Sequence, residues 1–195
     1  MKIIVIDKQN QFRLIPDSAL LLKHRPLFRP DYVQALHAKI ALVVKINRLG
    51  KYIQEKFAPT YYDEVGFAIN FYDKDCLDNQ IRQGLPWERA TCFDGSFALS
   101  EFMKISEISE KTELIISDNN SQLASLSSAS LRFSILNSQF LKISPTIAYL
   151  STHMTLKIGD YIALELDEIA SAPFEINDVL RLSFNDKELI RVVIK

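Results

Sequence analysis

Short runs of β-branched and aromatic residues recur along the chain and predict a protein built mainly from strands. Such runs, bounded by turn-forming residues, are typical of strands in a packed sheet. The expected strands are residues 2–6, 42–46, 65–71, 112–117, 161–166, 179–184 and 188–194. The last two flank Asn185 and Asp186, whose tolerance of turn conformations predicts a hairpin.

A helix is predicted to begin at Ser144, because serine is a good N-cap and Pro145 suits the first helical position. Its apolar residues recur at helical spacing and predict one buried face. They are Ile147, Leu150 and Met154.

A shorter helix is predicted over residues 74–83, with Gly84 ending it. Three aspartates lie around its start and suggest either a metal site or the acidic first turn that the helix dipole favours. They are Asp73, Asp75 and Asp78. We interpret them as structural. The Ser- and Asn-rich residues 117–134 predict a hairpin or loop.

Composition limits the possible functions. A chain of 195 residues, 48% of them hydrophobic, suits one domain with a sizeable core. The net charge of −1 gives no reason to expect nucleic-acid or bulk membrane binding, and no apolar stretch is long enough to span a bilayer. Two cysteines, Cys76 and Cys92, form no disulfide framework, so we expect a reduced, cytoplasmic protein.

Four segments carry a recognisable combination of motifs. They are residues 36–45, Arg48-Leu49-Gly50-Lys51, residues 61–71 and residues 84–95. In this order and spacing the segments resemble the fumarylacetoacetate hydrolase family, metal-dependent enzymes that hydrolyse, decarboxylate or isomerise keto-acid substrates. The resemblance covers residues 1–195 and implies a single domain with a mixed α+β, mainly β fold: a β-roll of mostly antiparallel strands with a few short helices. It also implies a homodimer.

The family's metal ligands are replaced in this chain. The resemblance places two family glutamates at Lys39 and Ala41, and a family aspartate at Asn70. Residues i and i+2 of a strand share a face, so the two glutamates can hold one cation, whereas a lysine repels it. We therefore expect no metal and no other cofactor.

Other elements of the family site are also altered. Thr91 stands at a family lysine, and Leu166 lies where the family carries a Thr-Gly-Thr-Pro loop. The N-terminal segment before Pro16 is too short for the family's His-containing lid. The sequence therefore predicts a vestigial pocket with no catalytic residue. Its expected members are Lys39, Ala41, Asn70, Thr91 and Leu166.

His37 offers an alternative, because relatives often carry a histidine before Ala-Lys in the lid. The motifs downstream place His37 in the metal strand instead, and no glutamate follows at position 40 to complete an acid–base pair.

Two functional hypotheses follow. In the first, the protein is a non-catalytic homologue, a pseudoenzyme that binds a small anionic metabolite or an active paralogue. In the second, it is a residual hydrolase, isomerase or decarboxylase acting on keto- or dicarboxylic acids without a metal. Lys39 would then serve as a Schiff-base lysine or a local cation. The missing family residues favour the first hypothesis, so we lean against an enzyme.

Overall fold

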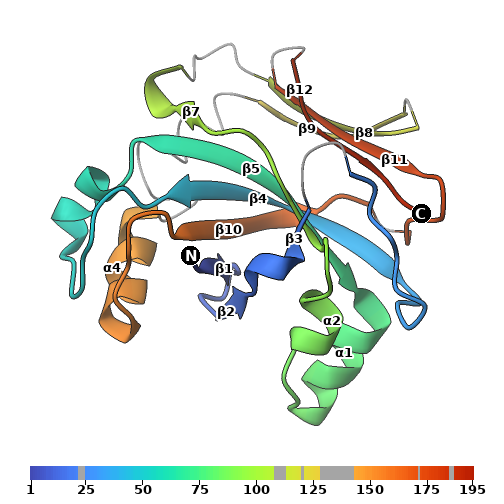
Figure 1. Ribbon diagram of the computed structural model, residues 1–195, viewed down its shortest axis with the longest axis horizontal. Coiled ribbons are helices and arrows are strands. Elements are labelled where there is room, and N and C mark those ends of the chain that lie inside the picture. Colours follow the sequence, from blue (N-terminus) through green and yellow to red (C-terminus); the bar gives the residue numbers. More distant parts are fainter. Residues whose placement is uncertain (22–24, 108–112, 120, 128–142, 171, 185–186) are drawn as a thin grey trace.

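Two β-sheets form the body of the protein (Figure 1). The computed structural model describes residues 1–21, 25–107, 113–119, 121–127, 143–170, 172–184 and 187–195. The strands are β1 (Ile3–Ile6), β2 (Phe12–Ile15), β3 (Leu20–Leu21), β4 (Leu36–Lys45), β5 (Glu64–Asp73), β6 (Phe97–Leu99), β7 (Met103–Lys104), β8 (Glu113–Asp118), β9 (Ser121–Ser127), β10 (Tyr161–Glu168), β11 (Val179–Phe184) and β12 (Lys187–Val193).

The helices are short. They are the 3₁₀ turns η1 (Asp17–Ala19), η2 (Glu55–Tyr61) and η3 (Ile105–Glu107), and the α-helices α1 (Lys74–Gln83), α2 (Glu88–Thr91) and α4 (Ile143–His153). In Figure 1, α4 lies below one end of the larger sheet and α1 with α2 below the other. None of the helices in the described ranges is both long and apolar enough to cross a membrane.

The larger sheet has the strand order β2-β1-β10-β4-β5-β6-β3, with β7 paired to β5. Most of its pairings are antiparallel, and the exceptions are β1 with β10 and β3 with β6. The smaller sheet, β12-β11-β8-β9, is antiparallel throughout. The expected mixed, mainly β fold of largely antiparallel strands is therefore confirmed.

The two faces of the larger sheet have different partners. One face packs on the smaller sheet, and residues such as Leu42 and Phe67 meet Leu180 and Leu182 in the main core. The other face carries a second, smaller apolar cluster that includes Ala41, Val43 and Ala68. Because side chains alternate along a strand, every second residue of β4 faces that second cluster.

β4 is long and almost wholly buried, as expected for an interior strand with β10 on one side and β5 on the other. The pairing sets Lys39 opposite Asn70 and His37 opposite Tyr72. This register brings the polar side chains of β4 and β5 next to one another.

The start of α1 shows what the aspartates before it do. The Asp73 carboxylate accepts a hydrogen bond from the backbone N–H of Cys76, at 3.2 Å, and so caps the helix. Gly84 ends the helix in the left-handed conformation, with φ of 64°. The structural interpretation of Asp73 is confirmed.

Candidate functional site

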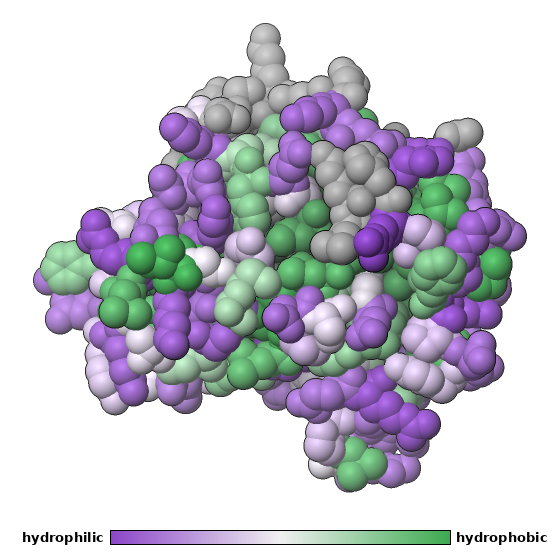
Figure 2. Space-filling model, in the orientation of Figure 1, coloured by the Kyte–Doolittle hydropathy of each residue, from purple (hydrophilic) through white to green (hydrophobic). Residues whose placement is uncertain are grey.

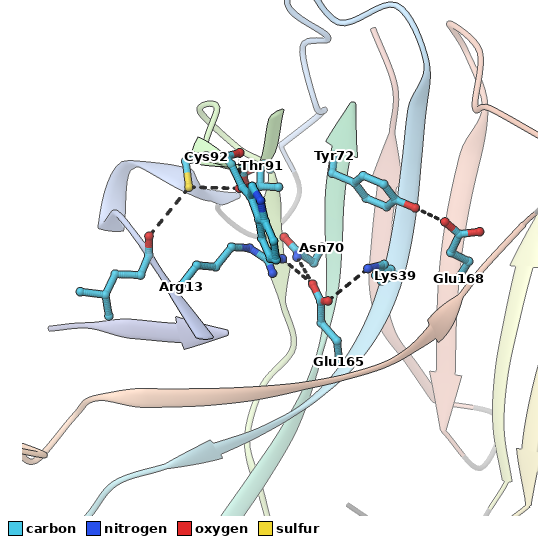
Figure 3. A network of polar contacts seen from close by, with 11 residues as sticks. Arg13, Lys39, Asn70, Tyr72, Thr91, Cys92, Glu165 and Glu168 are labelled. Carbon is cyan, nitrogen blue, oxygen red and sulfur yellow. Dashed lines mark hydrogen bonds and ion pairs between the residues drawn. The ribbon is translucent and has the colours of Figure 1, made fainter. Parts of the chain in front are cut away.

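A buried carboxylate, Glu165 on β10, organises the polar residues on the second face of the larger sheet (Figure 3). The Asn70 amide donates to its Oε1 at 2.8 Å. Arg13 of β2 donates to the same oxygen, and Lys39 Nζ lies 3.3 Å from Oε2. Three donors from three different strands therefore converge on one carboxylate.

Small side chains make room for this carboxylate. Glu165 is paired directly with Ala41, which is paired in turn with Ala68, and both alanines are completely buried. Each alanine extends no further than a methyl group, so the longer side chains of Lys39 and Asn70, one step along the same face, reach across to Glu165.

The electrostatic balance around Glu165 favours its ionised form. Burial alone would raise the pKa of this carboxyl, but the charges of Arg13 and Lys39 and the hydrogen bonds from Arg13 and Asn70 outweigh burial. Its pKa therefore lies below the ordinary value. Transferring a carboxylate from water to a protein interior costs roughly several kcal/mol of free energy unless opposite charges and hydrogen bonds offset that cost. Both are present around Glu165. With two cations against one anion, the buried group keeps a surplus positive charge.

A second polar group continues along the same face. The Tyr72 hydroxyl donates to Glu168, which also accepts from Lys74 Nζ at 3.1 Å. Lys39 Nζ lies 5.3 Å from the centre of the Tyr72 ring, so Lys39 links the two groups. Burial, followed by the bond to Glu168, raises the pKa of Tyr72. The hydrogen bond from Tyr72 in turn lowers the pKa of Glu168.

Three buried polar atoms in this region have no hydrogen-bond partner in the described part of the chain. They are Arg13 Nε, Asn70 Oδ1 and His37 Nδ1. A buried polar atom without a partner costs about 1–3 kcal/mol. Arg13 Nε is a donor and Asn70 Oδ1 an acceptor, and both side chains already hold the same Glu165 oxygen.

The structure brings together three of the five residues expected in a vestigial pocket. Lys39, Ala41 and Asn70 share one face and surround Glu165. Thr91 lies at the end of α2, where its hydroxyl donates to the carbonyl of Trp87 at 3.0 Å. Its hydroxyl also lies 3.5 Å from the sulfur of Cys92, which in turn lies 3.9 Å from the carbonyl oxygen of Leu14 on β2.

Leu166 is placed differently from the sequence analysis. Its side chain packs against the core between the two sheets, on the face opposite Lys39. Successive residues of a strand point to opposite faces, so the residue of this segment that belongs with Lys39 is its neighbour Glu165. His37 lies in β4 beside Tyr72, as the register of the motifs predicts, and not in an N-terminal lid.

Sequence reasoning missed Arg13, Glu165, Tyr72 and Glu168. A usable signal was present for Glu165, since a charged residue inside the apolar run of residues 161–166 predicts a buried, compensated charge. The sequence carries a weaker signal for Arg13, because β2 is only four residues long and lies at the edge of the sheet.

The side chains present do not suit a divalent cation. Hard cations such as Mg²⁺ need several oxygen ligands, mostly carboxylates. Here the central carboxylate is already held by two cations and an amide N–H₂ group, and Lys39 and Arg13 would repel a third cation. Across the described residues, no group of three or more His, Cys, Asp or Glu side chains is arranged to hold a metal.

Curated proteins with similar sequences are named oxaloacetate tautomerases. The Escherichia coli K12 protein YcgM is 28% identical over 177 residues, which cover 89% of this chain and 77% of the relative. The mitochondrial fahd-1 protein of Caenorhabditis elegans is 25% identical over 175 residues, covering 87% of this chain and 76% of the relative. No protein-family model matches the sequence.

Solved structures share the whole fold. A Yersinia pestis CO92 protein provisionally assigned to the fumarylacetoacetate hydrolase family superposes with a TM-score of 0.83 at 22% identity, over 100% of this chain and 92% of that one. The fumarylpyruvate hydrolase of Pseudomonas aeruginosa, solved with Mn²⁺ and pyruvate, gives a TM-score of 0.81 at 16% identity, over 100% of this chain and 90% of that one.

The chain therefore shares the fold of the fumarylacetoacetate hydrolase-like proteins. The chain is similar in sequence to oxaloacetate tautomerases and in fold to a fumarylacetoacetate hydrolase-family protein, which confirms the resemblance drawn from its motifs.

Proposed function

We propose that this protein is a non-catalytic homologue of the fumarylacetoacetate hydrolase family that binds a small anionic metabolite, of the keto- or dicarboxylic acid class, without a metal. The observation that carries the proposal is the surplus positive charge around Glu165, contributed by Arg13 and Lys39. The relatives named oxaloacetate tautomerases support this class of ligand.

The contacts support a direct mode of binding. Arg13 Nε and Asn70 Oδ1 are the unpartnered donor and acceptor beside the surplus charge. A carboxylate of the ligand accepts from Arg13 and is attracted by Lys39, whose side chain is 28% exposed. A hydroxyl or protonated oxygen of the ligand donates to Asn70. Lys39 thus attracts the anionic ligand in the way that a bound metal cation attracts it in a metal-dependent enzyme.

Calorimetric titration tests this proposal. Oxaloacetate, the compound in the name of the E. coli relative, should bind in buffer containing EDTA, and Mg²⁺ or Mn²⁺ alone should give no stoichiometric heat. Lys39→Met should weaken oxaloacetate binding by about tenfold or more, since a bond between charged groups is worth roughly 1.5–3 kcal/mol.

The matched control is Lys45→Met. Lys45 lies on the same strand and forms an ion pair of the same length, 3.3 Å, but with the partly exposed Glu64. Oxaloacetate affinity should be unchanged in this variant. Micromolar stoichiometric binding of Mn²⁺ contradicts the proposal.

The names of the curated relatives also favour a second candidate, a metal-independent reaction on keto acids. Lys39 is the residue that a Schiff-base mechanism needs, although it is already engaged in an ion pair with Glu165. Borohydride reduction in the presence of oxaloacetate traps such an adduct on Lys39. Absence of an adduct across a panel of keto acids eliminates this candidate.

The proposal also covers the oligomeric state and the cellular location of the protein. We expect a homodimer or a complex with an active paralogue, in the cytoplasm. Sedimentation velocity of the purified chain, alone and mixed with a paralogue, distinguishes these assemblies from a monomer.

A further inference from the structure

Four large apolar side chains are exposed at one end of the molecule. Leu49, Tyr52, Phe57 and Ile158 are 61%, 69%, 51% and 71% exposed, respectively. We refer to these four residues as the apolar edge. Single exposed apolar residues are ordinary, but a group of them marks an interaction surface. Figure 2 shows apolar atoms gathered at the left margin, where Figure 1 places η2.

Backbone hydrogen bonds hold the segments of the apolar edge together. Gly50 and Leu156 exchange two bonds, of 3.0 and 2.8 Å, so Leu49 lies beside the segment that carries Ile158. The N–H of Tyr52 donates to the carbonyl of Ser151 in α4, at 3.0 Å. The apolar edge is therefore a fixed part of the fold.

Tyr52 is held in a costly conformation. Its φ is 54°, in the left-handed region that residues other than glycine seldom adopt, at a cost of about 1–3 kcal/mol. The fold does not recover this cost by burying the ring, which projects into solvent. Strain of this kind clusters at functional sites, including those that contact a ligand.

Cations accompany the exposed rings. Lys51 Nζ lies 5.2 Å from the centre of the Tyr52 ring, and Lys56 Nζ lies 4.9 Å from that of Phe57. Arg48 and Lys157 are also exposed in these segments. Residues 48–57 and 157–158 thus hold four exposed cations against one exposed carboxylate, Glu55, so this end is locally basic although the whole chain carries a charge of −1.

We propose that the apolar edge docks on the surface of an anionic phospholipid bilayer. Exposed Leu, Ile, Phe and Tyr side chains enter the boundary between head groups and acyl chains, while lysine and arginine beside them bind anionic head groups. Lysine suits this arrangement, because its stem lies along an aromatic ring while its ammonium stays in water. A second copy of the chain fits poorly, because its cations would face these cations.

Sedimentation with vesicles tests the proposal. Vesicles of phosphatidylcholine with added phosphatidylserine should retain the full-length protein at low salt, and phosphatidylcholine alone should retain much less. The double variant Leu49→Ser/Ile158→Ser and the double variant Lys51→Glu/Lys56→Glu should each lower the affinity by about tenfold or more. Oxaloacetate binding, measured in parallel, should stay unchanged, which separates this proposal from the ligand proposal.

Phe28→Ser is the matched control. Phe28 is 70% exposed but lies next to the C-terminal segment, where Arg29 donates to Lys195. Its loss should leave vesicle binding unaltered. The proposal is overturned if the anionic vesicles do not retain the protein, or if both double variants still bind with wild-type affinity. It is also overturned if the two apolar substitutions instead turn a dimer into a monomer, which would make the edge an interface between chains.

Discussion

Glu165 lies directly opposite Ala41 in the antiparallel pairing of β10 with β4, and the methyl group of Ala41 leaves the carboxylate free to meet its partners. Directly paired residues have Cβ atoms about 4.5–5.5 Å apart, so a carboxylate placed on either strand can reach the same donors.

This relationship predicts that a carboxylate at position 41 can partly replace the one at position 165. Glu165→Ala should lower the free energy of unfolding by about 3–5 kcal/mol, because it leaves the largely buried Arg13 and the partly buried Lys39 without their anion. Adding Ala41→Glu should restore at least about 1 kcal/mol of that loss. Urea unfolding at neutral pH measures both changes. In the control, Glu165→Ala with Ala41→Gln, the amide has the same size and no charge, so equal recovery by Glu and Gln would contradict an electrostatic cause.

The lowered pKa of Glu165 predicts how stability depends on pH. A carboxyl with a lower pKa in the folded state contributes stability above its unfolded pKa, about 4.5, and loses that contribution as pH falls through the folded value. The wild type should therefore lose stability below about pH 4.5 more steeply than Glu165→Gln. Unfolding in urea at several pH values checks the slopes. Glu64→Gln serves as the control, because Glu64 forms a partly exposed pair and should leave the slope nearly unchanged.

Tyr72 predicts the opposite behaviour at alkaline pH. Burial and the neighbouring Glu168 raise its pKa, so the folded state holds the phenol proton after an unfolded chain has released it. The stabilisation is present below about pH 10 and falls as pH rises above the unfolded pKa. Tyr72→Phe should flatten this alkaline loss in thermal melts. Tyr52→Phe, at a ring that is 69% exposed, should not.

Leu166 tests which face of β10 belongs to the site. Because its side chain packs against the core between the sheets, Leu166→Ala should lower the free energy of unfolding by about 1–3 kcal/mol. Oxaloacetate affinity should stay within about twofold of the wild type when measured on folded protein. A large loss of oxaloacetate affinity with little loss of stability would contradict this placement and indicate that Leu166 lines the pocket.

The fold was predictable because most elements depend on local pattern. The helix expected over 74–83 coincides with α1, and the strand expected over 179–184 coincides with β11. The helix expected from Ser144 corresponds to α4, which begins at Ile143. The turn expected at Asn185 and Asp186 lies outside the described residues, but the strands that flank it are paired as a hairpin requires.

The polar site was less predictable because it depends on register between distant strands. The strand expected over 42–46 is the second half of β4, and the first half contains both His37 and Lys39. The family motifs alone were enough to place Asn70 with Lys39. Placing Glu165 with them required knowing that β10 pairs with β4, and Lys39 and Glu165 are 126 residues apart in the sequence. No periodicity within either strand specifies that pairing.

The parallel pairing of β1 with β10 has a consequence for how the chain folds during synthesis. Residues 3–6 are flanked on one side by β2 and on the other by residues 161–164, so the interior place of β1 is completed only after most of the chain has left the ribosome. Until then a short, wholly apolar segment remains unpaired along one edge and is a natural target for chaperones during synthesis.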